Sequence, residues 1–268
     1  MSIRSWLNQE ERYGKHFFSL EIIQRQFPEK SQSVLLSELS RLTHQHILTN
    51  IHNGFYVKTP VVYQATGVIP VYYYIDQLMA YLGKPYYLSL LTAGELFGAA
   101  PQRPQRTFVT TKFPASTISN RKNPYIHWNY REEIPVQLLV TRNGETGRLS
   151  ISSPELTAID LVQYPQHIGG LSNAATVLAE LLECTNFAKA DPMLYHFGSL
   201  PAFQRLGYIM EEVLGEKKQA DILYQQLKCA GKSFRWNRLS PNYPSVFSVT
   251  RNRRWRIEVN NELEVDDL

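Results

Sequence analysis

Residues 31–58 decide the fold of the N-terminal region and have the sequence SQSVLLSELSRLTHQHILTNIHNGFYVK. In the first half, Leu35, Leu39 and Leu42 are spaced four and three residues apart, which places them in one stripe along a helix. The spacing predicts a helix that is capped by Ser31 or Ser33 and extends to about residue 45. The opposite side of this helix carries small polar side chains and one guanidinium: Ser33, Ser37, Ser40, Arg41 and His44.

The second half of the segment predicts a β-hairpin. Asn53-Gly54 lies between two runs rich in β-branched and aromatic residues, Ile47–Ile51 and Phe55–Lys58, and a type I′ turn needs positive φ at both central residues. Two helices are expected upstream, one running from a Ser2 cap to about Arg12 and one over Leu20–Phe27, capped by Ser19 and ended by Pro28. Three helices followed by a hairpin predict a winged helix-turn-helix in residues 1–60.

This arrangement favours DNA binding. Small side chains let a helix approach base edges, and serine and arginine contact bases and phosphates. The expected DNA contacts are Ser31, Gln32, Ser33, Ser37, Arg41, His44, His52, Asn53 and Lys58. The alternative is a winged-helix protein-interaction module without DNA binding, whose polar helix face is only solvated. Charge does not decide between them, because seven Lys and Arg against five Glu leave residues 1–60 an excess of only +2.

Residues 61–268 mix helical and strand patterns. The expected helices are Tyr73–Leu82, Tyr86–Phe97, one from a Ser152 cap to Tyr164, one capped by Ser172, a short one at Asp191-Pro192, Phe203–Leu214 and Glu216–Cys229. The expected strands are Thr107–Lys112, Ile126–Tyr130, Val136–Arg142, Arg148–Ile151, Ser245–Thr250 and Arg254–Asn260. The predicted fold class is therefore α+β: an N-terminal winged helix-turn-helix (1–60) followed by a larger α+β domain (61–268) with a mixed or antiparallel sheet.

No motif for catalysis or for a cofactor stands out. The sequence has no phosphate-binding GxxxxGK[ST] or GxGxxG, no GxSxG and no spaced His/Cys set for a metal. Glu155 is interpreted as part of a helix start after Ser152, and Asp160 as a polar member of the same helix. A nuclease that uses Asp160 is the least favoured alternative. We therefore expect no enzyme activity, no catalytic residue, no cofactor and no metal.

The composition is that of a globular protein, with 43% hydrophobic residues, 19% charged residues and a net charge of +4. The N-terminus has no apolar signal-peptide core, and no stretch holds the ~20 apolar residues that span a bilayer. Cys184 and Cys229 are expected to be buried free thiols in a reducing compartment. These observations predict a soluble cytoplasmic protein that has no membrane partner.

Two basic clusters predict a second basic surface outside residues 1–60. One cluster follows residue 98 and the other lies near the C-terminus: Arg103, Arg106, Arg121 and Lys122, then Arg251, Arg253, Arg254 and Arg256. Guanidinium groups suit phosphate, so the functional hypothesis is contact with nucleic acid or another anionic partner. The alternative is a charged strand edge that discourages aggregation.

Four stretches of the chain form an ordered set: Ser37–Leu42 with Gly54–Val57, Tyr86–Ala93 with Gly98–Gln105, Ser153–Leu161, and Gln204–Tyr208 with Trp255. Together they resemble the AbiEi antitoxins of bacterial type IV toxin–antitoxin systems. The resemblance implies an N-terminal winged helix that binds inverted repeats in double-stranded DNA of its own promoter and represses the operon. It also implies a C-terminal domain that counters a nucleotidyltransferase-like toxin, without needing a stable complex, and it implies no catalytic residues.

Overall fold

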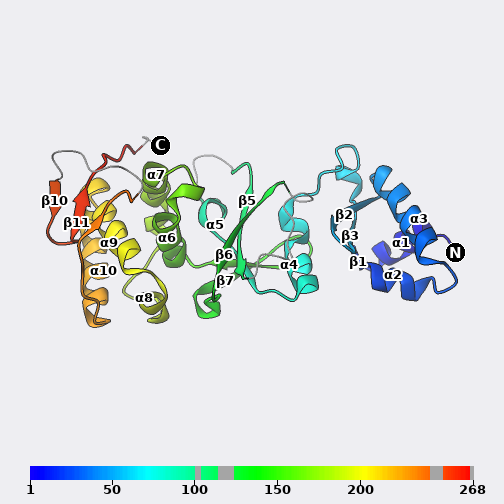
Figure 1. Ribbon diagram of the computed structural model, residues 1–268, viewed down its shortest axis with the longest axis horizontal. Coiled ribbons are helices and arrows are strands. Elements are labelled where there is room, and N and C mark those ends of the chain that lie inside the picture. The colour runs from blue at the N-terminus through cyan, green and yellow to red at the C-terminus, as the bar shows by residue number, and fades with distance from the viewer. Residues whose placement is uncertain (100–103, 114–123, 242–249, 266–268) are drawn as a thin grey trace. The chain divides into compact units, whose positions relative to one another are not determined.

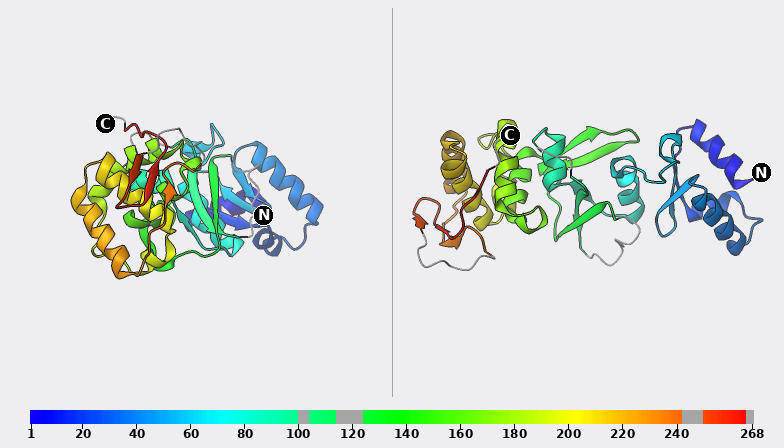
Figure 2. Two further views of the ribbon diagram at one scale, coloured as in Figure 1. Left: turned by 60° about the vertical axis from the view of Figure 1, so that its left-hand side comes forward. Right: turned by 90° about the horizontal axis from the view of Figure 1, so that it is seen from above.

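A computed structural model describes residues 1–99, 104–113, 124–241 and 250–265 (Figures 1 and 2). The chain divides into two compact units, and each is described by itself. Unit 1 comprises Met1–Tyr86, Thr111–Ile134 and Thr141–Ser150, and unit 2 comprises Tyr87–Thr110, Pro135–Val140 and Ile151–Leu268. The fold is α+β, as predicted. The finer division into domains 1–60 and 61–268 stays a prediction.

Three helices open unit 1, and each begins at a serine as the sequence predicted. They are α1 (Ile3–Arg12), α2 (Leu20–Gln26) and α3 (Gln32–His44). The Oγ atoms of Ser2, Ser19 and Ser31 accept hydrogen bonds from backbone amides three residues further on, at 3.1, 3.2 and 3.5 Å. These bonds satisfy first-turn amides that have no partner within the helix.

A three-stranded sheet completes this part of the unit, with strand order β1-β3-β2. The hairpin consists of β2 (Leu48–His52) and β3 (Phe55–Lys58), as predicted, with a register shift between Asn50 and His52. A further strand, β1 (Phe17–Ser19), was not predicted; it pairs antiparallel with β3. Because β1 covers its second edge, β3 is the central strand. The resulting order α1-β1-α2-α3-β2-β3 is that of a winged helix-turn-helix.

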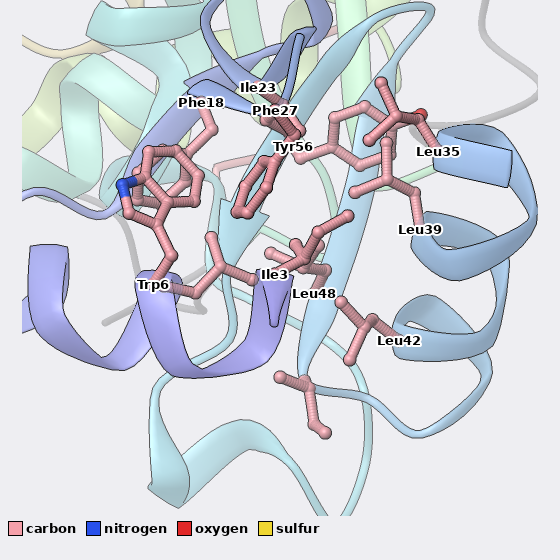
Figure 3. Close-up of a cluster of buried hydrophobic side chains, with 12 residues drawn as sticks. Ile3, Trp6, Phe18, Ile23, Phe27, Leu35, Leu39, Leu42, Leu48 and Tyr56 are labelled. Carbon is pink, nitrogen blue, oxygen red and sulfur yellow. The ribbon is translucent and has the colours of Figure 1, made fainter. Parts of the chain in front are cut away.

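The core of this region lies between the three helices and the sheet (Figure 3). Its buried side chains include Ile3, Trp6, Phe18, Ile23, Phe27, Leu35, Leu39, Leu42, Leu48 and Tyr56. The Trp6 ring makes edge contacts with Phe18 and Phe27, at centroid distances of 5.1 and 5.7 Å. The leucines of α3 therefore fix that helix on the core and leave its other side outward.

A five-stranded sheet has the order β6-β5-β4-β8-β7. Its strands are β4 (Tyr86–Leu88), β5 (Thr107–Lys112), β6 (Ile126–Arg131), β7 (Leu139–Asn143) and β8 (Arg148–Ser152). The prediction of one helix over Tyr86–Phe97 was wrong. Its first residues form β4, which pairs parallel with β8, and the helix α5 covers only Leu90–Leu96.

The helices outside this sheet largely follow the sequence pattern. They are α4 (Val71–Leu82), α6 (Pro154–Gln163), α7 (Leu171–Leu181), α8 (Met193–Phe197), α9 (Leu200–Tyr208) and α10 (Lys217–Cys229). The cap of α6 is Ser153 rather than Ser152, and α7 begins after Gly170 rather than at Ser172. A π-helical turn, Ile209–Val213, follows α9. Both cysteines are exposed free thiols, contrary to the expectation of burial.

A small sheet lies near the C-terminus, with order β10-β11-β9. Its strands are β9 (Asn237–Arg238), β10 (Thr250–Asn252) and β11 (Ile257–Val259). The predicted strand Arg254–Asn260 is therefore shorter, because its first three residues form a turn. Most of the predicted strand Ser245–Thr250 lies outside the described residues.

Candidate nucleic-acid interface

The outward side of α3 forms a narrow polar face. Leu35, Leu39 and Leu42 are only 1%, 1% and 3% exposed on the opposite side. At 100° of rotation per residue, the positions facing away from these leucines are held by short or polar side chains. All of them are exposed: Ser33, Ser37, Ser40, Arg41 and His44. We call these five residues the α3 polar face.

The start of α3 extends this face. Ser31 and Gln32 are exposed, and the Oγ atoms of Ser31 and Ser33 lie 3.0 Å apart. In helix-turn-helix proteins, the N-terminal residues of the recognition helix contact base edges. The first-turn amides also carry partial positive charge that favours a phosphate.

Two apolar side chains that the sequence analysis left out flank the polar face. Val34 and Leu36 are 46% and 42% exposed although they stand beside the leucines of the core. Their angular positions on the helix, to either side of the polar face, were a signal that could have found them. Exposed apolar groups at such a flank can contact thymine methyl groups.

The hairpin tip is held by the first helix that follows it. Tyr81 of α4 donates a hydrogen bond from its hydroxyl to the carbonyl of Asn53 at 3.1 Å, and its ring lies 6.3 Å from that of His52. Gly54 has φ 74°, and a Cβ there would meet the Tyr81 hydroxyl at 2.9 Å. Asn53 is exposed and His52 half-buried, so the tip offers the Asn53 side chain and part of the His52 ring.

Lys58 does not reach this face, which corrects its assignment as a DNA contact. The residue is 4% exposed, and its ammonium Nζ lies 3.6 Å from Oε2 of Glu11 on α1. Lys58 is the last residue of the central strand β3, where β1 and β2 flank it. Its role is to neutralise a carboxylate inside unit 1, not to meet phosphate.

Other lysines of residues 1–60 are also paired within the unit. Lys15 bonds Glu10 at 2.7 Å, and Lys30 pairs with Glu38. Arg41 is the only Lys or Arg in α3. The α3 polar face thus offers hydroxyl groups, one imidazole and one guanidinium, so its contact with a nucleic acid would depend on shape and hydrogen bonding more than on charge.

The second basic surface stays a prediction, and the structure shows where five of its eight residues lie. Arg106, Arg251, Arg253 and Arg256 are exposed, whereas Arg103, Arg121 and Lys122 lie outside the described residues. Arg254 is already engaged in ion pairs, which corrects its assignment to this surface. Its guanidinium pairs with Glu211 and Asp221, and although burial lowers the pKa of Arg254, the hydrogen bonds to these carboxylates raise it above its usual value.

Two of the stretches that resemble AbiEi antitoxins meet in the core of unit 2. The hydroxyl of Tyr87, next to Leu88 of β4, donates to Oδ2 of Asp160 on α6 at 2.9 Å, and both residues are completely buried. A buried carboxylate needs such a donor. Glu155, at the start of α6, accepts a hydrogen bond from the amide of Asn186 at 2.7 Å rather than completing a capping box. Both acids therefore make structural contacts within unit 2.

The fourth stretch packs on Trp255. A Cβ on Gly207 of α9 would lie 2.2 Å from the Trp255 ring, so only glycine fits beneath the indole. The indole Nε1 donates to Glu211 at 2.6 Å, and Gln204 donates to the Trp255 carbonyl at 2.6 Å. Gly207 and Trp255 can therefore lie in direct contact, because glycine has no side chain that would clash with the ring.

No metal cluster can be formed from the His, Cys, Asp and Glu side chains of the described residues. Within the same ranges, no helix combines the length and apolar character needed to cross a bilayer.

Unit 1 thus contains a region that resembles a winged helix-turn-helix and has an exposed polar helix face, and unit 2 has an α+β core of its own. Residues 87–212 match the family model described as the AbiEi antitoxin C-terminal domain. The chain therefore contains this antitoxin domain, and the resemblance to AbiEi-type antitoxins is confirmed. The match supports an antitoxin role in a toxin–antitoxin system.

The fold also resembles a solved structure. The crystal structure of RV2827C protein from Mycobacterium tuberculosis superposes with a TM-score of 0.67 and 14% sequence identity, covering 95% of this chain and 89% of that one. At this identity the likeness shows the fold alone. No curated protein matches the chain.

Proposed function

We propose that this antitoxin is also a cytoplasmic transcriptional autorepressor that binds its own promoter through the α3 polar face. The observation that carries the proposal is the exposure of Ser33, Ser37 and Arg41 on a helix whose other side is fixed by buried leucines. Such a helix presents short side chains to a major groove without a bulky group to keep it away. Unit 1 itself leaves this face uncovered, which favours DNA contact over the alternative of a protein-interaction module.

The weak positive charge of this face has a consequence for the binding mode. Phosphate neutralisation supplies most non-specific affinity, and one guanidinium per copy supplies little of it. We therefore propose that two copies bind together, one on each half of an inverted repeat. Their half-sites would be separated by roughly one helical turn, about 10 base pairs, or a multiple of it.

We further propose that the partner toxin is nucleotidyltransferase-like and that unit 2 opposes it. The AbiEi antitoxin domain supports an antitoxin role for residues 87–212, and the buried Tyr87–Asp160 pair shows that this domain has its own core. Repression and toxin neutralisation would then reside in different parts of the chain and be separable by mutation.

The direct test measures binding of the full chain to a promoter duplex that carries the inverted repeats, by fluorescence anisotropy. Arg41→Ala is expected to weaken binding by a factor of at least about 5, since one arginine–base contact contributes roughly 1–3 kcal/mol. Arg4→Ala is the matched control, because Arg4 is an exposed arginine of α1 outside the α3 polar face. Equal affinity of Arg41→Ala and wild type would show that α3 does not read the DNA.

A growth assay separates the two proposed roles. Cells that express the neighbouring toxin with the Arg41→Ala antitoxin are expected to survive, while a promoter reporter loses repression. If the same variant fails to protect the cells at normal antitoxin levels, the two roles are not separable and the proposed division is wrong.

A further inference from the structure

The outer face of the small sheet β10-β11-β9 gathers arginines around one exposed tryptophan. Register pairs Arg251 of β10 with Glu258 of β11, and Glu258 with Arg238 of β9. Residues paired across neighbouring strands share a face, so these three side chains form one row. Trp236 lies directly before β9, and Arg256 lies in the turn directly before β11, so the ring contacts decide where their side chains lie.

The ring contacts bring both side chains to this row. The guanidinium carbons of Arg251 and Arg256 lie 5.4 and 5.2 Å from the centre of the Trp236 ring. Trp236 is 40% exposed, whereas the other tryptophans of the chain, Trp6, Trp128 and Trp255, are at most 7% exposed. We call Trp236, Arg238, Arg251 and Arg256 the Trp236 face.

The inner side of the sheet holds the Trp236 face in place. Asn237 donates to Oε1 of Gln204 at 2.9 Å, and Asn252 donates to Glu212 at 2.8 Å. Ile257 is completely buried. Alternate residues of the same short strands are therefore tied to the body of unit 2, and the outward residues are presented from a fixed platform.

The charge of this face is unbalanced. Glu258 bonds Arg251 at 2.9 Å, but neither Arg238 nor Arg256 has an ion-pair partner among the described residues. Arg253, in the neighbouring turn, is also exposed. Arg256 has φ 53°, a left-handed conformation that is costly for arginine. An exposed indole beside the guanidinium of Arg256, which has no carboxylate partner in the described ranges, is suited to a ligand that combines flat rings with anions.

We infer that the Trp236 face binds single-stranded nucleic acid. An unpaired base stacks on the indole of Trp236, and the flanking phosphates contact Arg238 and Arg256. Stacking of this kind tolerates any base, since every base has a π-face. Duplex DNA, whose bases are stacked within the helix, cannot use the tryptophan in this way. The inference goes beyond operator binding by α3 and involves a different unit of the chain.

The test measures binding of the full chain to labelled 12-nucleotide oligo(dT) and oligo(rU) and to a duplex of equal length. Comparison of oligo(dT) with oligo(rU) shows whether DNA or RNA is the preferred ligand. Trp236→Ala is expected to weaken single-strand binding at least about fivefold, whereas Trp236→Phe retains most of it because a stacking ring remains. Arg256→Asn, which removes the charge and tolerates a left-handed backbone, should reduce the slope of log affinity against log salt by about 0.7.

Two controls keep the result interpretable. Arg4→Ala removes an exposed arginine elsewhere and should leave single-strand binding unchanged. Quenching of tryptophan fluorescence by the oligonucleotide should disappear in Trp236→Ala, since the other three indoles are buried.

Three outcomes overturn the inference. The first is that Trp236→Ala binds oligo(dT) and oligo(rU) as tightly as the wild-type protein does. The second is an equal loss of affinity for strand and duplex, which would leave only a charge effect. The third is tighter, Trp236-dependent binding of a polyglutamate peptide of matched charge, which would identify the face as a site for an acidic protein.

Discussion

Gly207→Ala tests the packing of unit 2, because two physical effects of known size oppose each other there. Gly207 lies in α9 with ordinary helical geometry, and replacing a helical glycine by alanine normally stabilises a protein by about 1 kcal/mol. Here the new Cβ would stand 2.2 Å from the Trp255 ring. The indole would have to retreat by about 1.2 Å to reach 3.4 Å, where ordinary contact begins.

Burial and a hydrogen bond hold Trp255 against that movement. It is 0% exposed, and its Nε1 donates to Glu211 at 2.6 Å. Overpacking costs roughly 1–3 kcal/mol, and a lost hydrogen bond to a charged group costs roughly 1.5–3 kcal/mol more. After the gain in helix propensity, Gly207→Ala should lower the free energy of unfolding by about 1.5–5 kcal/mol.

Urea unfolding followed by circular dichroism at 222 nm measures this change. Gly147→Ala is the matched control, because a Cβ there meets its nearest atom at 3.6 Å and its φ is not positive. It should be close to neutral. Combining Gly207→Ala with Trp255→Leu should cost less than the sum of the single changes, since the smaller side chain removes the clash. A Gly207→Ala protein as stable as wild type would refute the packing argument.

Three further predictions follow from individual contacts. Tyr87→Phe removes the buried hydrogen bond to Asp160 and should cost roughly 1.5–3 kcal/mol of unfolding free energy in the same urea assay. Ser31→Ala removes the cap of α3 and should cost roughly 0.5–2 kcal/mol, whereas Ser31→Asp, which keeps an acceptor, should cost less. Burial, with a smaller effect from Glu155, raises the pKa of Tyr195 to about 12. Because the unfolded state releases this proton near pH 10, stability should fall as pH rises from 10 towards 12, and Tyr195→Phe should make that decline shallower in thermal melts; a decline of unchanged steepness would contradict the assignment.

The parts of the fold that depend on local interactions could be predicted from the sequence. The helices α1, α2 and α3 begin where expected, because a serine cap and the amide it binds are three residues apart. The hairpin β2–β3 turns at Asn53-Gly54 for a similarly local reason, the positive φ that this turn requires. The exposed α3 polar face follows from one helical period.

The parts that depend on distant partners could not be predicted. β1 is three residues long and is a strand only because Phe55–Val57, almost forty positions later, pairs with it. Tyr86–Leu88 was predicted as the start of a helix that continues to Phe97, yet its pairing with β8 makes it a strand. The hydrophobic periodicity of one segment does not show which distant strand it pairs with, because pairing depends on both partners.

The candidate site shows the same limit. Lys58 was predicted as a DNA contact from its place in the hairpin, and Arg254 as part of a basic surface from the arginines around it. Their partners, Glu11 for one and Glu211 with Asp221 for the other, are distant in sequence and become visible only in the structure. Trp236 was overlooked because its significance depends on Arg251, which β11 brings alongside.

The indole beneath which Gly207 fits has a practical consequence for anyone who expresses this antitoxin in pieces. The family match ends at residue 212, yet Trp255 covers Gly207 and supplies partners for Gln204 and Glu211. A fragment that ends at residue 212 would expose the apolar side of α9 to water and would leave the side chains of Gln204 and Glu211 without their Trp255 partners. Any fragment intended to fold, crystallise or neutralise a toxin should therefore continue through β11.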